Sequence, residues 1–121
     1  MEQTYIDNVQ KGIDAATNYG VANGLTRETA YSISGRMAEE ISQGISIDMD
    51  IIFNNRNITG TYDNTNAAVN KIANDIAFYG IDKNIAQNMA QIISGFIAAA
   101  MFQCIAQGIA QHMNMMSTPN S

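Results

Sequence analysis

Residues 85–116 read IAQN-MAQI-ISGF-IAAA-MFQC-IAQG-IAQH-MNMM, and this stretch decides the fold. Each tetrad begins with Ile or Met, five of the eight have Ala in second place, and five have Gln in third place. No Asp, Glu, Lys or Arg occurs from Asn84 to the end of the chain. A helix that faces solvent in a monomer normally carries charged residues on its outer face. We therefore expect this helix to be covered by protein.

The spacing of the Ile and Met residues predicts how that helix packs. An α-helix turns about 100° per residue, so a residue repeated every four positions drifts about 40° per step. The ridge from Ile85 to Met113 thus winds most of the way around the helix, and different levels must meet different neighbours. Coiled coils absorb repeats near 3.5 or about 3.67, whereas i±4 ridges interlock in crossed packing at roughly −50°. We expect an all-α fold with steeply crossed helices.

Two environments satisfy such a helix: the centre of a single all-α domain, or contact with copies of the same chain. The chain has 121 residues, too few to surround a helix of this length on every side, so we favour self-association. Ser94, Gly95, Ala98, Ala99 and Gly108 would let backbones approach closely, and the glutamines either link chains or face solvent. The predicted assembly interface consists of Met89, Ile93, Gly95, Ile97, Ala99, Met101, Gln103, Ile105, Gln107, Ile109 and Gln111.

The rest of the chain predicts three further helices. Residues 3–18 form the first, with Thr4 as a possible cap and Gly20 as its stop. The second begins near Thr26 and continues to about residue 53. The Asn-rich run 54–64 predicts a loop, and a helix over 65–79 follows, capped by Asp63 or Asn64.

An internal repeat relates the two halves of the chain. A shift of 60 residues gives 11 identities in the 45 pairs from 9/69 to 53/113, including Tyr19-Gly20 with Tyr79-Gly80. The sequence predicts one helical domain of two tandem helix-turn-helix repeats, each a short helix, a Gly turn and a long helix. Repeat one spans about 3–53, repeat two about 65–113, and a flexible tail covers 114–121. Repeat one keeps its charges and would face solvent, whereas repeat two would be packed away.

Composition excludes several classes of protein. The net charge is −5 and the six basic residues are scattered, so no nucleic-acid surface is expected. A single cysteine excludes a disulfide framework and favours a reducing compartment such as the cytoplasm. The N-terminus lacks the features of a signal peptide. The longest C-terminal run without Asn, Gln or charge is 92–102, shorter than the roughly 20 residues of a membrane span, so membrane association is not expected.

Catalytic and metal-binding patterns are sparse. Cys104 and His112 would lie about 12 Å apart along one helix, too far for a nucleophile and its base. We therefore predict no enzymatic activity and no cofactor. The soft ligands Met101, Cys104, His112, Met113, Met115 and Met116 would suit Cu(I), but methionine at Ile positions is typical core filler, so no metal site is predicted.

The acidic residues of the second helix give no site either. Asp48 and Asp50, with Asn54 and Asn55 beyond them, lack the Gly and the final Glu of a calcium loop. We expect them, like Glu39-Glu40, to form a solvated helix face.

The C-terminal half resembles the structural subunits of refractile bodies (R-bodies, Reb-type proteins). The likeness lies in Ala90-Gln91, Ser94-Gly95, Gln103, Gln107 and the run from Gln111 to Asn114, after a helix that ends at Tyr79-Gly80. This resemblance implies an intracellular helical protein that polymerises into ribbons inside bacteria.

The sequence thus predicts a self-assembling structural subunit of a homopolymer, such as a ribbon, a filament or the shell of a virion or phage. Its partners would be copies of itself, and possibly a related subunit, in the cytoplasm of a bacterium or a phage-infected cell. The alternative is a small acidic binding or inhibitor module that buries residues 85–116 against a different protein. A peripheral or pore-forming membrane helix is disfavoured by the glutamine at every fourth residue.

Overall fold

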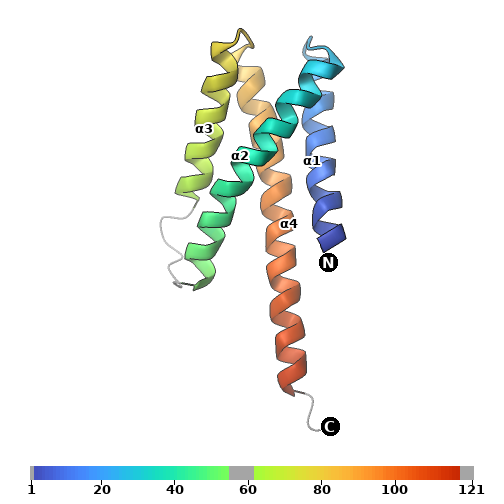
Figure 1. The fold of residues 1–121 in the computed structure, drawn as a ribbon, viewed down its shortest axis with the longest axis vertical. Coiled ribbons are helices and arrows are strands. Elements are labelled where there is room, and N and C mark those ends of the chain that lie inside the picture. Colours follow the sequence, from blue (N-terminus) through green and yellow to red (C-terminus); the bar gives the residue numbers. More distant parts are fainter. Residues whose placement is uncertain (1, 55–61, 118–121) are drawn as a thin grey trace.

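The computed structural model describes residues 2–54 and 62–117, and all regular structure within them is α-helical. The four helices are α1 (Glu2–Ala22), α2 (Arg27–Asn54), α3 (Asp63–Phe78) and α4 (Lys83–Ser117). Each helix runs in the opposite direction to the one before it (Figure 1). The all-α prediction is confirmed.

The pair α2 and α4 forms the centre of the molecule. Helix α1 packs on one side of this pair and α3 on the other, while α1 and α3 do not contact each other within the described residues. Helix α2 lies obliquely across α4, so that α1 and α2 diverge toward the end at which α4 leaves the other helices (Figure 1). Helix α4 therefore has three different neighbours, as its winding ridge predicts.

The core is built from tetrad ridges on both central helices. In α2 the ridge consists of Ile33, Met37, Ile41, Ile45 and Met49, and each of these side chains is buried. In α4 the fully buried ridge residues are Met89, Ile93 and Ile97. Two i±4 ridges can interlock only when the helices cross, because each ridge is inclined to its own axis. The spacing of four thus explains the oblique course of α2.

Two of the turns between helices contain a glycine with a positive φ. One of these two glycines, Gly24, is not the residue that the sequence predicted. Gly24 and Gly80 have φ of 104° and 101°, a left-handed conformation that suits a residue without a Cβ. Gly80 follows the prediction. The predicted stop at Gly20 is wrong, because Gly20 lies inside α1 where a Cβ would be 3.0 Å from the Ala30 Cβ and 3.2 Å from the Met89 Cε. Gly20 serves the close approach of helices rather than a turn.

The helix boundaries do not follow the sequence repeat. Ala22 and Phe78 end α1 and α3 and are 56 residues apart, as are Arg27 and Lys83, which begin α2 and α4. The sequence identities occur at a spacing of 60 instead. The two Tyr-Gly pairs consequently occupy different places, and the tandem-repeat organisation stays a prediction.

Other predicted boundaries are corrected by a few residues. Helix α1 begins at Glu2, so Thr4 lies within the helix and does not cap it. Thr26 does cap α2, since its hydroxyl accepts the Thr29 N–H at 3.1 Å. The predicted flexible tail began at residue 114, but α4 continues to Ser117. Most of the predicted loop 54–64, and residues 118–121, lie outside the described residues.

The N-terminus of α3 is capped by a side chain from α2. Tyr62, which precedes the helix in a left-handed conformation, makes no side-chain cap. Asp48 instead accepts the N–H groups of Asn64 (3.2 Å) and Thr65 (2.7 Å), the Thr65 hydroxyl (2.6 Å) and the Asn64 amide (2.9 Å). The predicted cap by Asp63 or Asn64 and the predicted solvent exposure of Asp48 are both wrong. A buried carboxylate is tolerated here because four donors and the positive end of α3 face it.

These hydrogen bonds determine how Asp48 titrates. Burial by itself raises the pKa of the carboxyl, but the hydrogen bonds from Thr65 and Asn64 outweigh it, and the pKa lies below the ordinary 3.8. Because the folded-state pKa is lowered, the ionised carboxylate stabilises the fold above the unfolded-state pKa. That contribution is lost as the pH falls through the folded-state pKa.

We predict that Asp48→Asn lowers the free energy of unfolding at pH 7 by about 2–3 kcal/mol, since an amide replaces a charged acceptor of several donors. Urea titrations should show the difference from the wild type shrinking below pH 3.8. Asp50→Asn is the matched control, because the Asp50 side chain is exposed and bonds only to Asn54 among the described groups. An equal loss in both variants would contradict the capping role.

Gly44 allows α3 to approach α2 just above this cap. A Cβ at Gly44 would lie 2.7 Å from the Asn64 carbonyl oxygen and 3.2 Å from the Ala68 Cβ. At Gly35, in the same helix, a Cβ would meet no atom within 4 Å. The two glycines therefore differ in what they contribute to the fold.

We predict opposite effects of alanine at these two positions. Gly44→Ala should destabilise the fold by about 1–3 kcal/mol, because backbone atoms must move. Gly35→Ala should stabilise it by about 0.5–1 kcal/mol, because alanine favours the helix and finds open space. Thermal and urea unfolding of both variants measure this. Equal changes would mean that the approach at Gly44 is not required.

Candidate functional site

Helix α4 passes through three environments along its length. Its first half is largely enclosed, Met101, Cys104 and Ile105 are half-buried, and every residue from Ala106 to Asn114 is exposed. Its 35 residues measure about 52 Å, against about 31 Å for α1, so its C-terminal part projects beyond the other helices (Figure 1). This projecting part has no Asp, Glu, Lys or Arg, and Gln107 at its beginning still lies beside Thr4 and Asn8 of α1.

The predicted interface residues fall into two groups. Met89, Ile93 and Ile97 lie in the core of the chain itself and are not accessible to a partner. Met101 and Ile105 are half-buried, and the remainder are exposed: Gly95, Ala99, Gln103, Gln107, Ile109 and Gln111. The ridge winds around α4, so its upper part faces the core and its lower part faces solvent.

The glutamines divide in the same way. Gln103 accepts a hydrogen bond from the Asn8 amide at 3.3 Å, and the Gln87 amide donates to Asn70 at 3.4 Å. These two therefore have partners within the chain. Gln91, Gln107 and Gln111 are exposed, and a role between chains stays a prediction for them.

A second apolar pattern lies on the outer face of α4, which we call the outer stripe. Six of its residues are exposed and one, Ile92, is half-buried; the set is Ile92, Gly95, Ala99, Phe102, Ala106, Ile109 and Met113. Their spacing alternates three and four, which keeps them on one side of a helix and is the seam pattern of coiled coils. The prediction from the sequence considered only the tetrads and missed this pattern. Counting apolar residues at a period of 3.5 could have found it.

The upper part of the outer stripe is hollowed. Gln91, Ile92, Gly95, Phe96 and Ala99 line a depression of about 390 Å³, which we call the Gly95 hollow. A Cβ at Gly95 would meet no atom within 4 Å, so the hollow results from the missing side chain. Its lining is almost wholly apolar in character.

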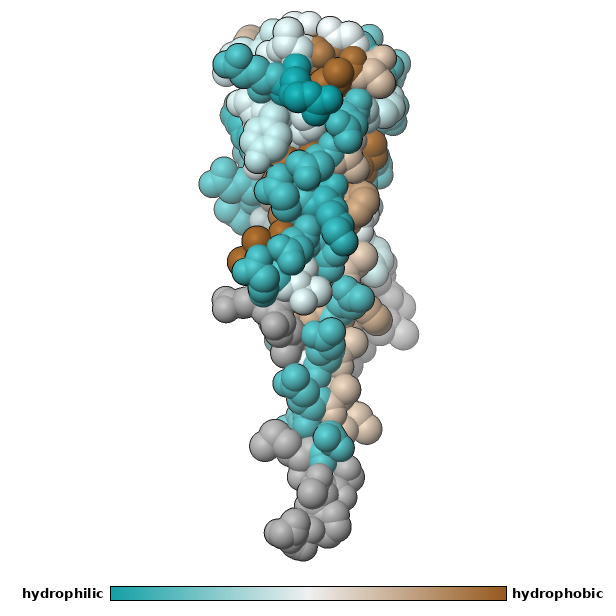
Figure 2. Space-filling model, turned by 90° about the vertical axis from the view of Figure 1, so that its right-hand side faces the viewer, coloured by the Kyte–Doolittle hydropathy of each residue, from teal (hydrophilic) through white to brown (hydrophobic). Residues whose placement is uncertain are grey.

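Figure 2 shows how polarity divides along the molecule. Hydrophobic residues gather along one edge of this view and continue onto the projecting part of α4, whose other edge is hydrophilic. Phe102, Ile109 and Met113 are 56%, 47% and 62% exposed. These three side chains form one exposed row, which differs from the singly scattered apolar residues usual on protein surfaces.

By length and composition, α4 is also the one described helix that could cross a membrane, and only 17% of its most apolar window is buried. The expectation of no membrane association stays a prediction, but the sequence estimate of the apolar segment, 92–102, is shorter than the helix that passes this test. That estimate ended the apolar segment at each glutamine, whereas the mean hydropathy of a longer window stays high even when it includes glutamines.

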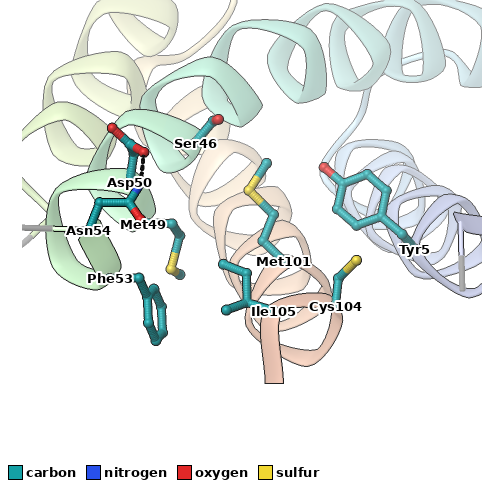
Figure 3. Close-up of a pocket in the computed structure, with 9 residues that line it drawn as sticks. All are labelled: Tyr5, Ser46, Met49, Asp50, Phe53, Asn54, Met101, Cys104 and Ile105. Carbon is teal, nitrogen blue, oxygen red and sulfur yellow. Dashed lines mark hydrogen bonds between the residues drawn. The ribbon is translucent and has the colours of Figure 1, made fainter. Parts of the chain in front are cut away.

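Next to the outer stripe, α4 also faces a groove where α1 and α2 diverge. Tyr5 comes from α1, Met49 and Phe53 from α2, and Met101 and Cys104 from α4 (Figure 3). This base groove has a volume of about 470 Å³. Phe53 also contacts Phe102 of α4, with ring centroids 6.2 Å apart.

The surroundings of Tyr5 in the base groove change the pKa of its phenol. Burial raises the pKa of its phenol, and the neighbouring Cys104 raises it further. A folded-state pKa above the unfolded value means that the neutral phenol contributes its full stability below about pH 10. This contribution is lost as the pH rises through the folded-state pKa.

We predict that the wild type loses more stability than Tyr5→Phe between pH 9 and pH 11, because phenylalanine has no proton to lose. Urea unfolding of both proteins across that range measures the difference. Tyr31→Phe is the control, since Tyr31 is exposed on α2. Parallel curves for Tyr5→Phe and the wild type would contradict the burial of a neutral phenol.

The described residues contain no group of three or more His, Cys, Asp or Glu side chains that could hold a metal ion. Cys104 is half-buried in the base groove, and His112 is exposed two turns further along α4. The geometry does not bring these two residues together.

Comparison of the chain with protein families, with curated proteins and with solved structures finds no match.

Proposed function

We propose that the protein is a self-assembling structural subunit of a homopolymer, without catalytic activity, and that copies associate through the outer stripe of α4. One observation carries this proposal: seven uncharged positions at alternating spacings of three and four remain accessible on a helix that projects from its own bundle. An exposed seam of this kind is stabilised by a second helix, because only then do its apolar side chains leave water.

Charge favours a second copy as the partner. Every charged side chain lies between Glu2 and Lys83, and the net charge is −5. Contact through the outer stripe, whose seven residues are all uncharged, therefore contributes no acidic side chain of α4 to the interface. The small residues Gly95, Ala99 and Ala106 also let two helix backbones approach closely.

The tandem-repeat organisation belongs to the same proposal. Repeat two supplies the pairing helix, and repeat one carries Arg36, Glu39 and Glu40 toward solvent. The resemblance to R-body subunits supports the same class of protein, an intracellular polymer such as a ribbon or filament.

Membrane association through α4 is the second candidate, because the helix is long and apolar enough to cross a bilayer. Insertion of its first half would have to remove Met89, Ile93 and Ile97 from the core of the bundle. That loss of packing makes assembly the better-supported function.

Sedimentation of the purified chain over a wide concentration range, with negative-stain microscopy of the same samples, tests the proposal. Large regular particles are expected without lipid. A monomer of 13.1 kDa at all concentrations would contradict it. Flotation with lipid vesicles by a protein that stays monomeric in buffer would favour the membrane candidate instead.

We predict that Gly95→Leu and Ala99→Leu each weaken assembly at least tenfold, because leucine fills the Gly95 hollow and separates the helix backbones. The helix content measured by circular dichroism should not fall, since leucine favours the helix and finds open space at Gly95. Ala67→Leu is the control, on the exposed face of α3. Undiminished assembly of both α4 variants would contradict the role of the outer stripe.

A further inference from the structure

We infer that two copies pair through their outer stripes in an antiparallel, two-fold arrangement, with Ile109 of each copy seated in the Gly95 hollow of the other. This inference rests on the proposed function and specifies its contact. The two-fold axis would pass between Phe102 and Gln103. Ala99 then faces Ala106 of the second copy, and Ile92 faces Met113.

The distribution of side-chain size along the outer stripe favours this direction. Gly95 and Ala99 lie toward the bundle, and Ile109 and Met113 lie on the projecting part. Antiparallel pairing places a large residue opposite the glycine, as close packing requires. Parallel pairing would set Gly95 against Gly95 and Ala99 against Ala99, which leaves a void beside the larger residues.

The Gly95 hollow has the form of a hole for an apolar side chain. Its lining comes from successive turns of α4, with Ile92, Phe96 and Ala99 around the glycine. Knobs-into-holes packing inserts a side chain of one helix between four residues of the other. Ile109 is the large β-branched residue at the matching level, and it is 47% exposed in the single chain.

Charge also favours the antiparallel direction. The acidic side chains belong to the bundle, which accompanies α4 only as far as about Ile105. In an antiparallel pair the projecting part of each copy lies against the bundle of the other, so the two bundles stand nearly end to end. A parallel pair would bring two bundles of net charge −5 side by side.

The two-fold pair through the outer stripe cannot by itself form a polymer. A two-fold contact uses the same patch on both chains and closes at two copies. The base groove residues Met101 and Cys104 are not part of the outer stripe, although Phe53 of the groove contacts Phe102 at its edge. A homopolymer would therefore grow from such pairs through a second contact.

Disulfide trapping tests the direction of pairing. In a Cys104→Ser background, which removes the chain's one cysteine, Ala99→Cys and Ala106→Cys are prepared separately. Each variant alone and their equimolar mixture are oxidised and analysed on non-reducing gels, with mass spectrometry to identify the linked peptides. Ala67→Cys on α3 is the matched control. A second pair, Ile92→Cys with Met113→Cys, tests the ends of the seam, and circular dichroism checks that each variant is folded.

The mixture should give at least tenfold more disulfide-linked dimer than either variant alone. In the antiparallel pair, residue 99 of one copy lies about 10 Å along the helix axis from residue 99 of the other, and the same holds for residue 106, which is too far for a disulfide. Linkage of Ala99→Cys to itself and of Ala106→Cys to itself would overturn the antiparallel inference and leave self-assembly intact. Particles without linkage in either mixture would overturn both the inference and the outer stripe as the contact. A monomer by sedimentation would overturn the proposed function together with the inference.

Discussion

A helical ridge that repeats every four residues cannot remain on one face, and the whole arrangement depends on this constraint. Met37 and Ile41 of α2 and Met89 and Ile93 of α4 are fully buried in one core, and ridges with this spacing interlock only when their helices cross. Because the helices cross, α1 and α2 diverge toward one end and open the base groove. For the same reason the ridge of α4 turns from the core to the surface along its length, and its C-terminal part is exposed.

The close approaches of α1 and α3 to the central pair occur at residues without a side chain. Gly12 lies against Phe96, Gly20 against Ala30, and Gly44 against the backbone of Asn64, each within about 3 Å of an added Cβ. Asp48 then anchors α3 through four hydrogen bonds. The stability of α3 thus comes from a tertiary contact, since a helix of 16 residues is marginal by itself.

Helix α4 carries two apolar patterns, and they differ in how far they are buried. The tetrad ridge at a period of four packs inside the chain, whereas the outer stripe at a period of 3.5 remains available to another helix. Gly95, at which an added Cβ meets nothing within 4 Å, contrasts with the glycines that contact neighbouring helices. Gly35 and Gly108 likewise leave open space at the Cβ position, so three glycines within helices have no close approach that requires them.

The sequence by itself determined the helical class, the tetrad core ridges, the start of the second helix near Thr26 and the glycine turn at Gly80, because these depend on local spacing and local hydrogen bonds. Only the tertiary structure decided that Asp48 is buried, that Gly20 lies within a helix, and that Met89, Ile93 and Ile97 belong to the core. These outcomes depend on which helix faces each residue, and periodicity does not specify the neighbour. The spacing of the outer stripe from Ile92 to Met113 can be found in the sequence. The structure was needed to distinguish its exposed residues from the buried ridge beside it.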